Sequence, residues 1–321
     1  MLEEFILKLQ WEELKSWKRG IHISLSDFKS LNHHIDTENM TFLSFGRNWV
    51  EHSLRKDATK KNLLTTLDLL NNFHSSTDFA DINYLFLLEF EAFMRQRKYE
   101  TNTIAKHMRQ LRTFVNEAIK RGYILPENYP FKKYQIKTTQ SKHTFLLPEE
   151  IKRLEQLAQT SCPKSLLHSL KAFLFCCYTG VRYSDFILLT EKNIISIQRK
   201  KWLVFRTVKT NTEVSLPLYL LFQGKALRLL QEYHQDLSTF FHLKSNSSVN
   251  KDLKKIAVLA KIEKHFSFHT ARHTNATLLI YNGAQITTVQ KLLGHQSVKT
   301  TQGYSDIFSG TIVKDLKKCK F

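Results

Sequence analysis

The chain has few cysteines, no long apolar run and a shortage of acidic residues. Its four cysteines among 321 residues form no Cys-x-x-Cys pair, so we expect reduced thiols and not a disulfide framework. The most apolar stretch, Leu166 to Tyr178, is interrupted by His168 and Lys171 and is too short to cross a bilayer. The first four residues include two acids, unlike the basic start of a signal peptide. These absences predict a cytoplasmic protein with no membrane partner.

Basic residues greatly outnumber the acidic ones, and the excess is unevenly distributed. The chain contains 48 Lys and Arg against 29 Asp and Glu, which gives a formal net charge of +19. Residues 1–140 hold 21 basic and 17 acidic residues, whereas residues 141–321 hold 27 and 12. A strongly basic surface of this kind favours a polyanionic partner. We expect that partner to bind chiefly to the second half of the chain.

The second half also contains six residues that can handle a phosphate group. An arginine holds two non-bridging phosphate oxygens through a planar fork of donors, which a lysine does not match. Histidine and lysine add donors and a titratable acid, and a tyrosine can serve as a covalent nucleophile. With these cations built into the protein, such a site needs no carboxylate cluster for magnesium, so we expect no metal and no cofactor. The six residues are Arg182, Lys209, His269, Arg272, His295 and Tyr304.

The local sequence around these residues indicates how they are presented. Gly180 follows the apolar run and is typical of the residue that ends a helix, which would turn Arg182 out of the core. His269 and Arg272 are three residues apart and therefore share one helical face. A second glycine ends the apolar segment before His295.

This ordered set resembles the tyrosine recombinase, or phage integrase, family. Four sequence motifs between residues 179 and 304 look like the family's conserved boxes. They are Thr-Gly-Val-Arg, His-Thr-Ala-Arg-His-Thr, Leu-Leu-Gly-His and Thr-Thr-Gln-Gly-Tyr. Upstream, residues 102–124 are similar to the helical core-binding domain of integrases from Bacteroidetes mobile elements. The resemblance implies a site-specific DNA recombinase that breaks and rejoins double-stranded DNA without metal or ATP. It also implies a homotetramer on DNA and a monomer or weak dimer when free.

The resemblance assigns each residue of the set a role. Tyr304 would attack a phosphodiester and form a 3′-phosphotyrosyl link, while the two arginines neutralise the equatorial oxygens. The two histidines would donate hydrogen bonds or move the proton of the nucleophile. Lys209 would protonate the leaving 5′ oxygen. Asp185 would support the site without touching the phosphate.

The fold class that we expect is mainly helical with a small antiparallel β-sheet. Residues 1–37 form an amino-terminal segment of unknown role, and residues 38–125 a helical core DNA-binding domain. Residues 126–147 are predicted to be an extended basic linker, because two prolines are followed by lysines. Residues 148–321 form the catalytic domain, ending in a tail helix. We expect this helix to dock on a neighbouring subunit, and packing against its own catalytic domain is the alternative. Alternating apolar residues predict three strands within 194–217, with Lys209 at their second turn.

A basic helix face and the linker supply the candidate DNA contacts outside the catalytic set. An apolar stripe from Ile104 to Ile119 predicts an amphipathic helix, and basic residues lie off the stripe. The predicted DNA-binding residues are Lys106, Arg109, Arg112, Lys132 and Lys133.

Other functions remain open at this point. A dimer resolvase of the same family and a type IB topoisomerase would use the same chemistry. A DNA-binding module that has lost catalysis is disfavoured because all six positions are filled. A zinc enzyme is a further alternative, since His265, His269 and His273 are spaced four residues apart, although no glutamate follows His269 as a metalloprotease helix would require. Asp306, two residues after Tyr304, departs from the basic or histidine residue common in the family, which would slow the reaction slightly.

Overall fold

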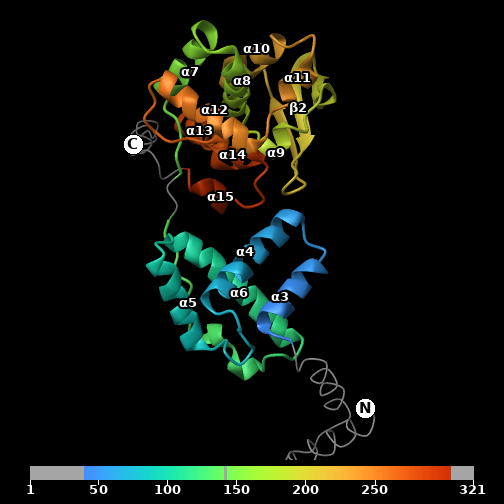
Figure 1. The fold of residues 1–321 in the computed structure, drawn as a ribbon. Helices are drawn as coiled ribbons and strands as arrows, with labels where there is room; N and C mark the ends of the chain where they lie inside the picture. The colour runs from blue at the N-terminus through green and yellow to red at the C-terminus, as the bar shows by residue number, and fades with distance from the viewer. Residues whose placement is uncertain (1–39, 141–142, 305–321) are drawn as a thin grey trace, which may run out of the picture. The chain divides into compact units, whose positions relative to one another are not determined.

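The computed structural model describes residues 40–140 and 143–304, which belong to two compact units (Figure 1). Unit 1 comprises Met1–Ser141 and unit 2 comprises Lys142–Phe321. The predicted amino-terminal segment 1–37 and the predicted tail helix lie outside the described residues. In the described part, no helix is both long and apolar enough to cross a membrane.

The described residues of unit 1, 40–140, form a bundle of four α-helices around an aromatic and aliphatic core. Two of its helices begin with a side-chain cap, because Thr41 and Asn83 each accept a hydrogen bond from the backbone N–H three residues ahead. Phe90 and Phe114 are completely buried at its centre. The helices are α3 (Phe42–Glu51), α4 (Asp57–Phe73), α5 (Tyr84–Gln96) and α6 (Thr101–Lys120).

Helix α6 carries the apolar stripe that the sequence predicts. Ile104, Met108 and Leu111 are buried in the core of unit 1, and Ile119 packs against it while half-buried. On the other faces of the helix, Arg109 and Arg112 are exposed, whereas Lys106 is half-buried, and Lys132 and Lys133 are exposed beyond the helix. The exposed residues are accessible to a partner, and their role in DNA binding stays a prediction.

The predicted linker is wrong at its beginning. Two 3₁₀ turns, Pro126–Asn128 and Pro130–Lys132, use the prolines as first residues, where a missing N–H has no cost. The turns bring Phe131 and Tyr134 into the core of unit 1, and the Tyr134 hydroxyl donates a hydrogen bond to Glu91. Residues 133–140 and 143–147 form neither helix nor strand. The segment without regular structure therefore starts after residue 132, and α7 follows residue 147.

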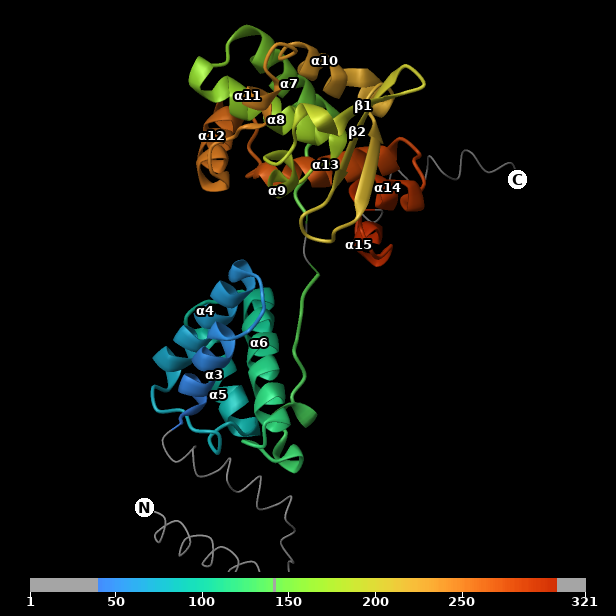
Figure 2. The same ribbon diagram turned by 90° about the vertical axis from the view of Figure 1, so that its right-hand side faces the viewer.

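Unit 2 is built around helix α8 (Lys164–Thr179), which is buried along most of its second half. Both views of the ribbon place α8 among the other long helices of the unit (Figures 1 and 2). Because apolar residues surround the last turns of α8 on all sides, the helix has no solvent face there. The helices that pack against it are α7 (Pro148–Thr160), α10 (Lys225–Gln231), α11 (Leu237–Phe241), α12 (Asn246–Leu259) and α13 (Phe268–Tyr281).

Three short helices complete the part of unit 2 that forms the site. They are α9 (Tyr183–Phe186), α14 (Ile286–Leu293) and α15 (Lys299–Gln302). Helix α14 lies between the end of α13 and the last strand of the sheet. Two 3₁₀ turns, Glu191–Asn193 and Leu221–Gly224, flank the sheet.

The predicted sheet is present as three antiparallel strands in the order β1-β2-β3. They are β1 (Ile194–Ile197), β2 (Lys200–Arg206) and β3 (Glu213–Pro217). Leu203 pairs with Leu216, and Phe205 with Val214, so one face of the β2–β3 hairpin is buried in the core. The turn that joins β2 and β3 carries Lys209, as predicted. The sheet and the helical units together confirm the expected fold class.

Candidate active site

Two glycines, each at the end of a helix, let neighbouring segments of the site pack closely against the backbone. Gly180 caps α8 with φ of 72°, and Gly294 caps α14 with φ of 62°. A Cβ on Gly180 would lie 2.5 Å from a methyl carbon of Leu293, and one on Gly294 would lie 2.8 Å from a methyl carbon of Val214. Glycine is therefore required here both for its backbone conformation and for space. The sequence prediction that these residues end their helices is correct.

Hydrogen bonds to the ends of both glycine-capped helices hold Arg272 in place. It lies on α13, is only 3% exposed, and donates hydrogen bonds to the carbonyl oxygens of Gly180 at 2.8 Å and Leu293 at 2.5 Å. Burial and the nearby positive charge of Arg182 lower the pKa of its guanidinium to about 9. Two cations packed together in this way favour an anion between or beside them.

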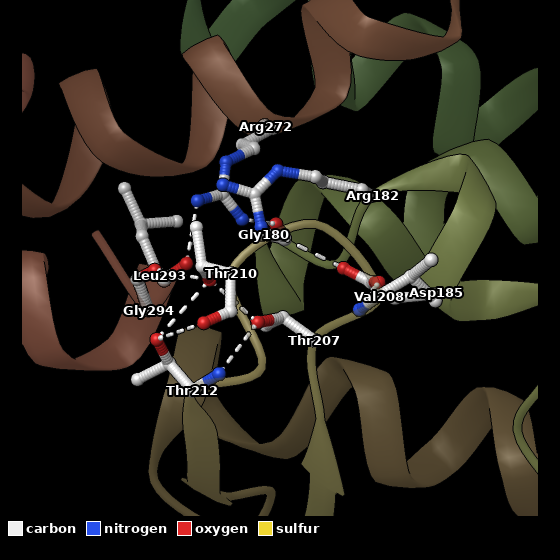
Figure 3. A network of polar contacts seen from close by, with 10 residues as sticks. All are labelled: Gly180, Arg182, Asp185, Thr207, Val208, Thr210, Thr212, Arg272, Leu293 and Gly294. Carbon is white, nitrogen blue, oxygen red and sulfur yellow. Dashed lines mark hydrogen bonds and ion pairs between the residues drawn. The ribbon is translucent and has the colours of Figure 1, made fainter. Parts of the chain in front are cut away.

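Arg182 lies next to Arg272, two residues after the α8 cap, as Figure 3 shows. Its Nη1 is 3.7 Å from Oδ2 of Asp185, which is an ion pair without a hydrogen bond. Within the described part, both of these buried atoms lack a hydrogen-bond partner. An unpartnered guanidinium nitrogen beside a second arginine is suited to donate a hydrogen bond to a phosphate oxygen.

The carboxylate of Asp185 also holds the turn that carries Lys209. Its Oδ1 accepts a hydrogen bond from the backbone N–H of Val208 at 2.9 Å (Figure 3). Because Lys209 follows immediately, this bond fixes the backbone next to an exposed lysine. Asp185 therefore contacts both an arginine and the lysine turn, which is consistent with the supporting role that we predict for it.

Threonines tie the same turn to the end of α14. Thr207 Oγ1 accepts a hydrogen bond from the backbone N–H of Thr212 at 3.1 Å, which closes the turn on itself. Thr210 Oγ1 donates to the carbonyl oxygen of Gly294 at 3.4 Å (Figure 3). The lysine turn and the glycine that precedes His295 are thus one connected unit.

Tyr304 lies just after α15 and is 6% exposed. Its hydroxyl forms a hydrogen bond with Nδ1 of His273, with 3.0 Å between the two atoms. His295 does not bond the hydroxyl; its Nδ1 lies 2.9 Å from Thr301 Oγ1, and its ring is parallel to the tyrosine ring with 6.4 Å between centroids. Burial raises the pKa of Tyr304, and the positive charges of Arg272 and Arg182 oppose that rise. The tyrosine is therefore a neutral phenol in this state.

The two predicted histidines are neutral at physiological pH. Burial, followed by the charges of Arg272 and Arg182, lowers the pKa of His295 to about 4. His269 keeps an exposed surface, yet partial desolvation and the same two arginines lower its pKa as well. Lys209 contributes to both shifts, so all six predicted residues lie within one electrostatic neighbourhood.

Sequence reasoning missed three features of this neighbourhood. His273 was considered only as a metal ligand, although it stands inside the His-Thr-Ala-Arg-His-Thr box, and His143 was assigned to the linker. The rings of His143 and His273 stack with 4.5 Å between centroids, and His143 lies 6.0 Å from the ring of Tyr304. The threonines around Lys209 were not singled out, and only the repeated Thr in that turn would have indicated them.

The arrangement does not suit the zinc alternative. Helix α13 begins at Phe268, so His265 precedes it and does not share a helical face with His269 and His273. Those two rings do meet, edge to face at 4.7 Å. Across residues 40–140 and 143–304, no group of three or more His, Cys, Asp or Glu side chains is placed to hold a metal ion.

Comparison with known proteins agrees with this geometry. The profile of the phage integrase family matches residues 144–309, and that of the phage integrase SAM-like domain matches residues 41–136. The chain belongs to the phage integrase family. Two curated relatives are tyrosine recombinase XerD of Listeria innocua, 30% identical over 236 residues, and tyrosine recombinase XerC of Oceanobacillus iheyensis, 28% identical over 243 residues. These alignments cover 69% and 71% of this chain, and 77% of each relative.

Solved structures show the same fold at low sequence identity. A fragment of lambda integrase, crystallised as a dimer bound to a COC′ core site, superposes with a TM-score of 0.70 at 17% identity. That alignment covers 84% of this chain and 95% of the fragment. The Tn1549 transposon integrase in complex with a circular intermediate DNA gives 0.70 at 15% identity, covering 88% and 100%. The predicted family, the two-domain fold and the prediction of a tyrosine-type DNA strand transferase are confirmed.

Proposed function

We propose that this recombinase cleaves double-stranded DNA through Tyr304 and that its catalytic set is the six residues found from the sequence. The observation that carries the proposal is the convergence of the set. Two arginines, the lysine turn and two histidines share one electrostatic neighbourhood with a buried tyrosine hydroxyl. These residues come from different elements, so only folding brings them together.

The arginines supply the phosphate site. Arg272 donates to two carbonyl oxygens, which holds its guanidinium plane in one orientation before any ligand binds. Arg182 brings a buried nitrogen that has no hydrogen-bond partner in the described residues. Donors held in place beforehand stabilise the charge that develops on phosphoryl oxygens without reorganising during the reaction.

Lys209 and Tyr304 divide the bond-making and bond-breaking steps. Tyr304 forms a bond to phosphorus, and the 5′ oxygen leaves with a proton from Lys209. The energy of the broken bond is retained in the 3′-phosphotyrosyl link, so no ATP is consumed. Attack of a different 5′-hydroxyl on this link exchanges strands. His269 and His295 donate hydrogen bonds to the bound phosphate.

Assembly on DNA completes the proposal. The strong positive charge of residues 141–321 favours a duplex as the partner. One structure of similar fold is a lambda integrase tetramer bound to a Holliday junction, with a TM-score of 0.68 at 17% identity. We extend that assembly to this chain as a tetramer that forms on paired sites, and as a monomer or weak dimer in free solution.

A dimer resolvase of the same family is the second candidate, because the chain is also similar to the tyrosine recombinases XerC and XerD. The mobile-element integrase is favoured by the fold shared with the Tn1549 transposon integrase. Recombination assays separate the two. An integrase joins two different DNA molecules at distinct sites, whereas a resolvase converts a plasmid dimer that carries two identical sites into monomers.

The decisive experiment for the chemistry is covalent trapping on a nicked suicide substrate. We expect the wild-type chain to become linked to the DNA and Tyr304→Phe to bind the same DNA without any linkage. Tyr219→Phe is a matched control, because it also removes one phenol hydroxyl. The ring of residue 219 is kept, and with it the packing on Trp202 of the sheet. Trapping by Tyr304→Phe would refute the assignment, and relaxation without strand exchange would favour a topoisomerase.

A further inference from the structure

His273 is the only described residue whose side chain hydrogen-bonds the hydroxyl of Tyr304. It lies on α13 one residue after Arg272 and one turn after His269, so the helix that anchors the arginine also sets its position. The two histidines that the sequence favours as proton carriers stand elsewhere. His295 is bonded to Thr301, and the exposed His269 meets the ring of His273 instead of the phenol.

The protonation states set the direction of this hydrogen bond. Burial lowers the pKa of His273 to about 3, and the surrounding positive and titratable groups add to that effect. A neutral imidazole has one ring nitrogen with a free lone pair, and the buried phenol of Tyr304 keeps its proton. With the ring proton of His273 on Nε2, Tyr304 donates and Nδ1 of His273 accepts. The groups that face His273 are His269 and Arg272 on α13, His143 before α7, His295 after α14 and Tyr304 after α15.

We propose that His273 is a catalytic residue, the general base that takes the proton of Tyr304 during cleavage. The proposal rests on the proposed function of Tyr304. As Tyr304 Oη bonds to phosphorus, its proton passes to His273 Nδ1. The bond from phosphorus to the 5′ oxygen breaks as Lys209 gives that oxygen a proton. On rejoining, His273 returns the proton to Tyr304 and Lys209 recovers one from the attacking hydroxyl.

The bound DNA makes this base effective. In the free protein the neighbouring positive charges oppose protonation of His273. A phosphodiester held by Arg182 and Arg272 brings a negative charge beside them, which favours the charged imidazolium. The base therefore gains strength only when its substrate is in place. His143 stacks on the ring of His273, a contact that restricts rotation of the imidazole while Nδ1 bonds the hydroxyl.

The test compares variants that keep or lose the ability to accept a proton. In His273→Asn an amide oxygen replaces Nδ1, so the hydrogen bond from Tyr304 is retained but no proton is taken up. We expect single-turnover cleavage of the suicide substrate to fall by about 100-fold, the usual contribution of a general base. DNA affinity should be unchanged. His234→Asn is the matched control, because His234 is exposed and bonds only the carbonyl of Gln231.

The pH profile distinguishes a base from a residue that merely holds the tyrosine. Wild-type cleavage should slow as pH falls and His273 becomes protonated, and the asparagine variant should lose this acidic limb. Added imidazole should restore cleavage to His273→Ala. A wild-type rate in His273→Asn, or a slower rate with the acidic limb intact, would overturn the proposal. If His273→Asn fails to fold, His273→Gln carries the same test.

The two proposals fail separately in these assays. If Tyr304→Phe still becomes covalently linked to the DNA, the proposed nucleophile is wrong. If Tyr304→Phe is inert but the histidine variants cleave normally, the nucleophile stands and the base is another group.

Discussion

Replacing Gly294 with alanine tests whether the close contact at the end of α14 organises the active site. Gly294 has a φ of 62°, a left-handed conformation that costs an alanine about 1–2 kcal/mol. The new Cβ would also lie 2.8 Å from a methyl carbon of Val214 and 3.2 Å from one of Thr207. Overpacking of this kind costs about 1–3 kcal/mol. We expect Gly294→Ala to lower the free energy of unfolding by roughly 2–5 kcal/mol.

Gly224→Ala is the matched control in the same unit. Its φ of 73° imposes the same backbone strain, but a Cβ there would meet no atom closer than 3.5 Å. We expect this variant to lose only about 1–2 kcal/mol. Urea unfolding of the full chain measures both, and covalent trapping reports the site. Gly294→Ala should also slow cleavage, because Gly294 accepts the hydrogen bond of the turn that carries Lys209. Equal losses of stability in the two variants would refute the close-contact explanation.

Three further predictions concern charge and protonation. Arg182→Ala and Arg272→Ala should each lose about 3–4 kcal/mol of transition-state stabilisation in single-turnover cleavage. Arg272→Lys should not restore the lost rate, because one ammonium group does not reproduce a guanidinium that bonds two carbonyl oxygens. Lys209→Ala should cleave a substrate whose 5′ bridging oxygen is sulfur, because sulfur leaves without a proton; a bound but uncleaved sulfur substrate would assign the acid role to another residue. In unit 1, burial lowers the pKa of His107 from 6.5 to about 4, so the folded state binds fewer protons and its free energy of unfolding should fall as pH drops from about 6.5 to about 4. His107→Asn should flatten that decline in pH-dependent urea titrations, and an unchanged slope would contradict it.

Much of the fold was predictable because the informative patterns are local. The stripe on α6 has a helical period, and β2 and β3 place buried residues at every second position. The glycines after α8 and α14 end apolar runs, and each presents a phosphate-handling residue soon after. In all these cases the decisive information lies within one short, continuous segment of the chain.

Other features depend on contacts between distant segments and were missed. Pro126 and Pro130 indicated a linker, but burial of Phe131 and Tyr134 draws that segment into the core of unit 1. The bond between His273 and Tyr304 joins residues 31 apart in sequence and exists because α15 returns to α13. No periodicity or motif spacing predicts such a contact.

The most direct measurement of the central claim is the chemical identity of the covalent link. After trapping on the suicide substrate, the complex is digested with nuclease and protease, and its peptides are analysed by mass spectrometry. We predict one modified peptide, in which Tyr304 carries the remaining nucleotide through a 3′ phosphate. A nucleotide on any other residue, or a link to a 5′ phosphate, would contradict the proposed mechanism.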